Sequence, residues 1–363
     1  MRILIANPFG IGDVLFSLPF LYALRERDPK GYIGYLCNRR TEELVTSSFP
    51  IDMHWTFEKD EWRVLWRRSK KKALQQLIQF PKAIQKERFE FFVDFSLGWH
   101  YGLGALLAGI PRRIGFDFRG RGRFLTEKLP LAGFHEKPVA EYLLDLLPFL
   151  GLSRPQQIRT DLSLPKEAQE EAGRTLSSLG ISPTRPFVCI VPGGGASWGP
   201  NAIFKQWAPE QFAQAADRIA DHFKAQILII GDESEAPLCE KVRSLMREKA
   251  SCATPIPKLL LLAGIFKKAD LLLGNDSGPM HLGAAVATKT VTIFGPVDAR
   301  VYGPYSASLN GFLHRTVTKG LACRPCYQGF RFPPCPWNNA CLKHLSNEEV
   351  FDVVRKCWEV PPP

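Results

Sequence analysis

Short apolar segments alternate with helix-like segments along most of this chain of 363 residues. The expected strands are residues 2–6, 32–37, 89–95, 187–191, 226–230, 271–274 and 290–294, and the expected helices include residues 14–27, 139–150, 209–223, 235–249, 259–268 and 280–287. Repeated strand–helix units with apolar strands predict parallel sheets covered by helices on both faces. We therefore expect an α/β protein with two facing Rossmann-like domains and a ligand-binding cleft between them.

A polar stretch at residues 153–185, punctuated by prolines, separates the two series of strand–helix units. A chain of this length favours two domains of ordinary size. We expect an N-terminal Rossmann-like domain at residues 1–165 and a C-terminal one at residues 166–345. Residues 346–363 then form a last helix that packs back on the body.

The formal net charge of +11 points to an anionic partner. Residues 62–72 hold six cations beside two tryptophans, and five arginines occur within residues 112–123. Nucleic acid, an anionic membrane surface and a phosphorylated acidic substrate are the candidate partners, whereas any single cation is more simply explained as part of a solvated helix face. The apolar runs are too short to span a bilayer, and the first residues resemble a strand rather than a signal peptide, so we expect a cytoplasmic protein.

Four of the nine cysteines, Cys323, Cys326, Cys335 and Cys341, lie close together in the sequence. In a reducing cytoplasm a disulfide framework is not expected. The spacing leaves two interpretations open, a structural zinc ion or buried thiols in a proline-rich loop. Nothing in the pattern indicates a catalytic metal.

The segment at residues 274–284 joins an expected buried strand to a helix of small residues. Ser277 is predicted as the helix N-cap, followed by Gly278, with Pro279 in the first helical position. Such a turn directs backbone N–H groups and the positive end of a helix dipole at a phosphate or diphosphate. Asp276 and His281 flank this position and can hold hydroxyl groups. The alternative is an ordinary strand–turn–helix corner.

Asp13 follows the first expected strand in the segment Gly10-Ile11-Gly12-Asp13. It can act as a helix N-cap, or as a carboxylate that takes a proton from an attacking hydroxyl. The third glycine of a dinucleotide-binding fingerprint is missing here, which disfavours an NAD-linked oxidoreductase.

Three glycines follow the strand at residues 187–191, and two of them, Gly193 and Gly194, are expected to let a ligand phosphate approach the backbone. Lys205 can neutralise a diphosphate leaving group, although a surface lysine is the ordinary expectation at this position. Glu235 or Glu233 follows the next strand and can accept the ribose hydroxyls of a nucleotide, or simply begin a helix.

These segments occur in an order that resembles glycosyltransferase family 9, the bacterial heptosyltransferases of the lipopolysaccharide core. The resemblance runs nearly end to end and rests on Gly12-Asp13-Val14, Arg113-Ile114-Gly115-Phe116, His135 with residues 142–147, Pro192-Gly193, Lys205-x-Trp207, Gly231-x3-Glu235, Asp276-Ser277-Gly278-x2-His281, Phe294-Gly295-Pro296, and Cys323-x2-Cys326-Tyr327 with Cys341-Leu342. It implies a GT-B fold and inverting, metal-independent transfer of heptose from ADP-heptose, with no cofactor.

The resemblance also implies roles for single residues. Asp13 matches the general base and Lys205 the lysine on the donor phosphates. Glu235, Asp276, Ser277 and Gly278 match donor-binding positions. Our hypothesis adds Gly193, Gly194, Leu259 and His281 on the donor side, and Arg63, Arg67, Arg119 and Arg121 on the acceptor side. The partners are then a nucleotide sugar, a lipid-linked anionic saccharide and the inner membrane surface, but not nucleic acid. A GT-B transferase that uses another nucleotide sugar, and a non-catalytic nucleotide-binding protein on the same fold, stay as alternatives.

Overall fold

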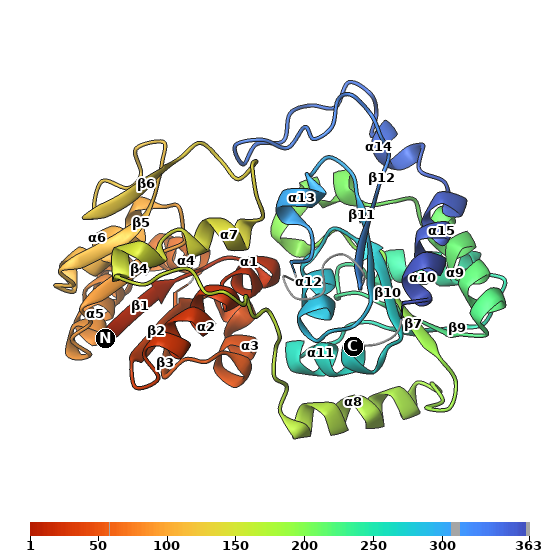
Figure 1. Cartoon of the computed structure of the whole chain (residues 1–363), viewed down its shortest axis with the longest axis horizontal. Helices are drawn as coiled ribbons and strands as arrows, with labels where there is room; N and C mark the ends of the chain where they lie inside the picture. The colour runs from red at the N-terminus through yellow and green to blue at the C-terminus, as the bar shows by residue number, and fades with distance from the viewer. Residues whose placement is uncertain (58, 306–312, 361–363) are drawn as a thin grey trace. The chain divides into compact units, whose positions relative to one another are not determined.

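A computed structural model describes residues 1–57, 59–305 and 313–360, without the side chains of residues 59–63, 73–78, 196–197 and 200. The chain forms two compact units, drawn from red to yellow and from green to blue in Figure 1. Unit 1 comprises Met1–Phe134 and Val139–Ile158, and unit 2 comprises His135–Pro138 and Arg159–Pro363. Each unit is built on a six-stranded parallel sheet, which confirms the predicted α/β class.

The sheet of unit 1 has the strand order β3-β2-β1-β4-β5-β6. Its strands are β1 (Arg2–Ala6), β2 (Tyr32–Cys37), β3 (Met53–Thr56), β4 (Phe91–Asp94), β5 (Arg112–Phe118) and β6 (Glu127–Leu131). From β1 the chain first adds strands on one side of the sheet and then, from β4, on the other side. The boundary between β1 and β4 is therefore the topological switch point of this sheet, where ligands of such folds bind.

Helices cover both faces of this sheet. They are α1 (Ile11–Phe16), α2 (Leu18–Arg27), α3 (Glu42–Ser48), α4 (Lys59–Arg68), α5 (Lys70–Lys86), α6 (Trp99–Leu107) and α7 (Val139–Leu144). Leu4, Leu36 and Phe92 share one core cluster with Ile84 of α5 and Ala105 of α6. Because side chains alternate along a strand, that face belongs to α5 and α6, while α2 packs with α7.

The sheet of unit 2 has the order β12-β11-β10-β7-β8-β9, with its switch point between β10 and β7. Its strands are β7 (Phe187–Val191), β8 (Gln226–Ile230), β9 (Ala250–Ala253), β10 (Leu271–Asn275), β11 (Thr290–Phe294) and β12 (His314–Thr318). All residues of β7, β10 and β11 are buried, as expected for central strands of a parallel sheet.

The helices of unit 2 form two layers around this sheet. They are α8 (Lys166–Ser178), α9 (Pro209–Phe223), α10 (Ala236–Leu245), α11 (Leu259–Lys268), α12 (Gly278–Ala285), α13 (Ala299–Tyr302), α14 (Ala340–Lys343) and α15 (Asn347–Trp358). Phe212 of α9 and Val350 of α15 share a core cluster with Leu271 and Leu273, whereas Leu272, on the opposite face, lies against α12. The last helix, α15, thus packs on α9 within unit 2 and begins with a capping box at Ser346.

Serines divide two helical regions of unit 1, and one of these regions was expected as a single helix. The helix expected at residues 14–27 separates into α1 and α2 at Ser17, whose hydroxyl donates to the carbonyl of Val14 and hydrogen-bonds with Tyr35. The basic region separates into α4 and α5 at Ser69, which is extended and caps α5 by accepting from the backbone N–H of Lys72. Serine competes with regular helix through such local hydrogen bonds.

The prediction of a helix over residues 235–249 is too long, because α10 ends at Leu245 and the strand β9 follows. Among the residues that the structure describes, no helix is long and apolar enough to cross a membrane.

Candidate functional site

The predicted donor-side residues gather at one edge of the sheet in unit 2. Gly193 and Gly194 follow β7, Glu235 follows β8, and Asp276 and Ser277 follow β10. Since β10, β7 and β8 are neighbours in a parallel sheet, their carboxyl ends lie together at the switch point.

Asn275 holds this edge together and was missed in the sequence. It is fully buried at the end of β10, where its Nδ2 donates to the carbonyl of Pro192 (2.6 Å) and its Oδ1 accepts from the backbone N–H of Trp207 (3.0 Å). A buried side-chain amide is stable only when it is hydrogen-bonded in this way. A polar residue at the end of an apolar strand was the available signal.

Glu235 lies directly against the glycine loop that follows β7. A Cβ atom built on Gly193 would be 1.9 Å from Oε1 of Glu235, so a larger residue at this position would displace the Glu235 carboxylate. Burial raises the pKa of Glu235, the charge of Asp232 adds to the rise, and backbone hydrogen bonds from Asp232, Gly195 and Gly194 oppose it. Of the two predicted carboxylates, Glu233 is exposed and Glu235 faces the loop.

Lys205 is buried, so the interpretation as a surface lysine is wrong. It ends the 3-10 segment Ala196–Lys205 and is 5% exposed. Its Nζ lies 2.8 Å from Oδ2 of Asp276 and 4.5 Å from the ring centre of Trp198. A buried cation needs an opposite charge, and Asp276 supplies it.

His281, one turn into α12, lies on the other side of Asp276, with Nε2 4.0 Å from Oδ1. Burial lowers the pKa of His281 to about 4, with the charge of Lys205 acting in the same direction and that of Asp276 opposing it. The imidazole is therefore neutral at neutral pH and can exchange hydrogen bonds with hydroxyl groups without adding charge.

Ser277 is the N-cap residue of α12, as predicted, but its side chain does not cap the helix. The hydroxyl is buried and has no hydrogen-bond partner within the part of the chain that the structure describes. Gly278 is the first helical residue, so Pro279 takes the second position and not the predicted first one. A buried, unsatisfied hydroxyl beside a helix N-terminus suits an anionic ligand.

Leu259 is the first residue of α11 and is half-buried. It follows the loop that leaves β9, the outermost strand of the sheet. Leu259 therefore lies farther along the row of carboxyl strand ends than the other donor-side residues.

Asp13 lies at the switch point of the other sheet, in unit 1. It is the third residue of α1, whose N-cap is Gly10, so the alternative role of Asp13 as an N-cap is wrong. The carboxylate residue is half-buried, and its backbone carbonyl accepts from Nδ2 of the buried Asn7 (2.9 Å).

Asp94 is a second carboxylate at the same edge of unit 1 that the sequence interpretation did not single out. It ends β4 in register with Ala6 of β1, and it is 4% exposed. Its Oδ1 accepts from the backbone N–H of Ser96 (2.8 Å). Burial raises the pKa of Asp94 to about 7, although hydrogen bonds from Ser96 oppose this. An acidic residue near the end of an expected apolar strand was the available signal.

Two of the predicted acceptor-side arginines meet on one aromatic ring. Arg119 and Arg121 are exposed in the loop after β5, with Cζ atoms 4.7 Å and 5.4 Å from the ring centre of Phe118. Arg67 is exposed on α4, and Arg63 falls outside the described side chains.

The four clustered cysteines differ in exposure, from exposed Cys323 to Cys341 in the core of unit 2. Within residues 1–57, 59–305 and 313–360, no three His, Cys, Asp or Glu side chains are grouped to hold a metal ion.

Each unit is Rossmann-like and has polar or charged side chains at the switch point of its parallel sheet, and two such units are the components of a GT-B fold. The model of glycosyltransferase family 9 (heptosyltransferase) matches residues 77–325, and lipooligosaccharide heptosyltransferase 2 of Campylobacter jejuni (strain 81116) is 32% identical over 98% of this chain and 99% of its own. The chain belongs to glycosyltransferase family 9, the heptosyltransferases.

Solved structures agree with this fold. A family 9 glycosyl transferase from Veillonella parvula covers 98% of this chain and 97% of its own, with a TM-score of 0.78 and 20% identity. The Escherichia coli ADP-heptose lipopolysaccharide heptosyltransferase II covers 99% of this chain and 98% of its own, with a TM-score of 0.73 and 18% identity. The GT-B expectation is thereby confirmed.

Proposed function

We propose that this enzyme transfers heptose from ADP-heptose to a sugar of the lipopolysaccharide inner core, with inversion and without a metal ion. One observation carries the donor assignment: the buried Lys205–Asp276 pair lies at the start of α12, beside the unsatisfied hydroxyl of Ser277. Lysine and a helix N-terminus are both suited to a diphosphate. The Escherichia coli relative is named for ADP-heptose, which supports the same donor here.

The donor-side residues divide between the parts of ADP-heptose. Lys205, Ser277 and Gly278 hold the diphosphate, and Asp276 with neutral His281 holds heptose hydroxyl groups. Glu235 accepts the ribose hydroxyls, Gly193 and Gly194 leave the backbone open to the nucleotide, and Leu259 contributes to the pocket of the base. The support for Glu235 is its raised pKa and its position against Gly193 at the sheet edge.

The transfer step needs a base and a stabilised leaving group. Asp13 takes the proton of the acceptor hydroxyl while the hydroxyl oxygen forms a bond to the anomeric carbon of heptose. The bond from that carbon to the diphosphate oxygen breaks on the opposite face, and ADP leaves with the electron pair. Lys205 and the N-terminus of α12 stabilise the charge that develops on ADP, which is the role that a divalent cation has in other transferases.

On the acceptor side, Arg119 and Arg121 bind the anionic groups of a lipid-linked saccharide, with Arg67 and Arg63 contributing from α4. The support is that Arg67, Arg119 and Arg121 are exposed on a chain of net charge +11. We place the enzyme in the cytoplasm, in peripheral contact with the inner membrane surface, and expect no nucleic-acid partner.

Four measurements test the proposal. Asp13→Asn should lower kcat by about 10² or more and leave the Kd for ADP unchanged, whereas Asp221→Asn, an exposed control on α9, should change neither. NMR of the product should show an inverted anomeric centre, and EDTA should not reduce the rate. A fully active Asp13→Asn enzyme contradicts the assignment of the base, and calorimetry showing tighter binding of UDP than of ADP favours a transferase with another nucleotide sugar.

A further inference from the structure

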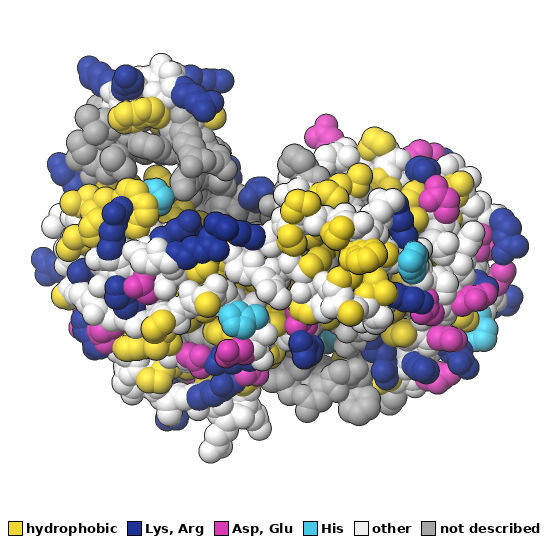
Figure 2. All heavy atoms as spheres, turned by 90° about the horizontal axis from the view of Figure 1, so that it is seen from above, with side chains coloured by type: hydrophobic (Ala, Val, Ile, Leu, Met, Phe, Trp, Pro, Cys, Tyr) yellow, Lys and Arg dark blue, Asp and Glu magenta, His cyan; other side chains and the backbone are white. Residues whose placement is uncertain are grey.

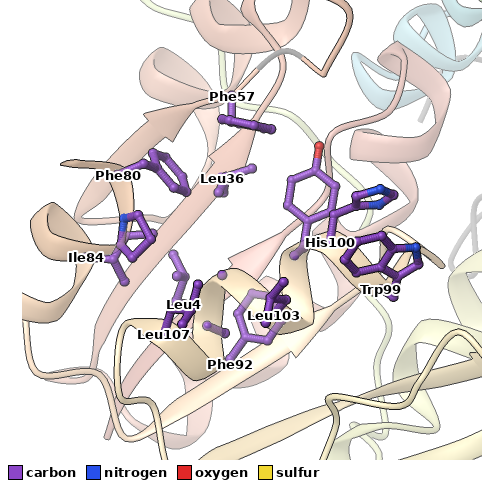
Figure 3. A pocket seen from close by; sticks show the side chains of 14 residues that line it. Leu4, Leu36, Phe57, Phe80, Ile84, Phe92, Trp99, His100, Leu103 and Leu107 are labelled. Atoms are coloured by element: carbon purple, nitrogen blue, oxygen red, sulfur yellow. The ribbon is translucent and has the colours of Figure 1, made fainter. Parts of the chain in front are cut away.

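An apolar cavity of about 380 Å³ lies inside unit 1, between the sheet and helices α5 and α6 (Figure 3). The sheet contributes Leu4, Leu36 and Phe92, α5 contributes Phe80 and Ile84, and α6 contributes Leu103 and Leu107. A volume of this size is within the range of small-molecule binding sites, which extends from about 300 to 1,000 Å³. The two helices therefore leave room for an apolar ligand on the face that they cover.

The wall formed by α6 continues to the protein surface. Leu107 lines the cavity and is 61% exposed, and the neighbouring Leu106 is 42% exposed. Apolar side chains of this size gain stability from burial, so an occupant that extends past Leu107 would cover surface that the chain itself leaves in water.

Gly104 keeps the cavity open in the middle of α6. A Cβ atom built on Gly104 meets nothing within 4 Å, and the residue lines the cavity. Glycine lowers the stability of a helix interior, and here no atom of the described chain requires its small size. A larger side chain at this position would enter empty space.

The cavity has polar groups at one end. Trp99, His100 and Tyr101 begin α6, and Figure 3 shows Trp99 and His100 together on one side of the cavity. Their rings stack with a centroid distance of 3.9 Å. The exposed Arg123 places its Cζ 4.5 Å from the ring centre of Trp99. An apolar interior that ends in aromatic polar groups and a cation matches an amphiphile with an anionic headgroup.

The helix before α5, α4, exposes side chains of the kinds that bind a membrane surface. α4 carries exposed Trp66 and Val64 beside exposed Arg67 and Arg68. Figure 2 shows several groups of Lys and Arg on unit 1, with hydrophobic side chains exposed between them. Tryptophan and basic residues together favour anionic lipid surfaces.

We propose that this cavity binds one fatty acyl chain of an anionic lipid, with the headgroup next to Trp99 and Arg123. The acyl chain comes either from the lipid-linked acceptor, in which case the inference rests on the proposed function, or from a membrane phospholipid. Both sources present the same chemistry to the cavity, an unbranched hydrocarbon chain attached to an anionic head.

The direct test uses the protein of 363 residues and 11-(dansylamino)undecanoic acid as the probe, with fluorescence as the readout. Gly104→Leu fills the cavity from a position where Cβ meets no other atom, and Gly104→Ala is the matched control. We expect the leucine variant to bind the probe at least tenfold more weakly, and the alanine variant to bind it like the wild type. Equal binding by all three proteins, each with an unchanged circular dichroism spectrum, overturns the inference.

Leu107→Glu is the second variant, because its exposed position makes it compatible with folding. It should also weaken probe binding, and unchanged binding by this variant counts equally against the proposal. Turnover with a deacylated acceptor separates this inference from the proposed function, since that rate tests transfer alone and Gly104→Leu should not alter it.

Two further assays identify the source of the bound acyl chain. A raised KM of Gly104→Leu for the acylated acceptor identifies the acceptor as the source. An unchanged KM, with weaker binding to vesicles of phosphatidylglycerol and phosphatidylethanolamine, identifies a membrane phospholipid.

Discussion

Lys205→Met tests whether the buried ion pair of unit 2 stabilises the fold in addition to its proposed role in binding the donor. The side chains of Lys205 and Asp276 are only 6% and 7% exposed, and Nζ lies 2.8 Å from Oδ2. Methionine keeps most of the apolar stem over Trp198 but removes the charge. Asp276 is then left buried beside His281, which is neutral because burial lowers its pKa to about 4. Removing one partner of a buried pair costs about 3–5 kcal/mol of stability.

This cost translates into a large shift of the melting temperature. For a domain of the size of unit 2, each kcal/mol lowers Tm by about 2–4 °C, so the transition of Lys205→Met should fall by at least about 6 °C at the lower ends of both ranges. The double variant Lys205→Met/Asp276→Asn carries no uncompensated charge and should recover most of the loss. Differential scanning calorimetry of the full chain provides the measurement.

The activity assay separates structure from chemistry. The double variant should be nearly as stable as the wild type and still lose about 10²-fold or more in kcat, because the charge next to the leaving diphosphate is gone. A single Lys205→Met variant that melts like the wild type would refute the reasoning on stability. A stable double variant with full activity would refute the role of Lys205 at the diphosphate.

Three further predictions concern other charged residues of the site. Glu235→Gln should raise the Kd for ADP severalfold in calorimetry, since the amide replaces one acceptor for ribose hydroxyls, and an unchanged Kd would contradict the assignment. Asp94 has a folded-state pKa of about 7 against an ordinary 3.8, so it lowers stability progressively as pH rises from about 4 to 7. Asp94→Asn should therefore match the wild type in urea unfolding at pH 4 and exceed it at pH 8 by up to about 4 kcal/mol; equal stability at both pH values would contradict this. Arg119→Gln with Arg121→Gln should raise KM for the acceptor, less so at high salt, without changing the Kd for ADP.

The central strands of the fold, and helices with clear start and stop signals, were predictable from the sequence. The strands β7, β8 and β11 have the predicted bounds, because each is a short apolar run. The helix α9 also begins and ends where expected, with Pro209 in its first turn and a left-handed residue, Lys224, after its end. Local signals alone determine these elements.

Edge strands were harder to predict, because their sequences are not apolar. β9 consists of small residues, and β3, β6 and β12 mix polar with apolar residues. The same holds for β5, which lies beside the edge strand β6 and begins with Arg112 and Arg113. Each is a strand because it pairs in parallel with the strand before or after it in the chain. Tertiary pairing of this kind overrides weak local preference.

The same distinction applies to the site. Glycines, serine and carboxylates after strands could be predicted as donor-side residues, because the ends of parallel strands lie at one edge whatever the rest of the chain does. The burial of Lys205 could not be predicted, since a lone lysine before a helix is ordinarily exposed. Only its contact with Asp276, far along the chain, makes the buried lysine stable. Asp94 shows the intermediate case: its place near the end of a strand was visible, but its raised pKa depends on the pairing of β4 with β1 at the switch point. A carboxylate after a strand therefore becomes a site candidate only when the strand order is known, because the order decides which two strand ends flank the ligand.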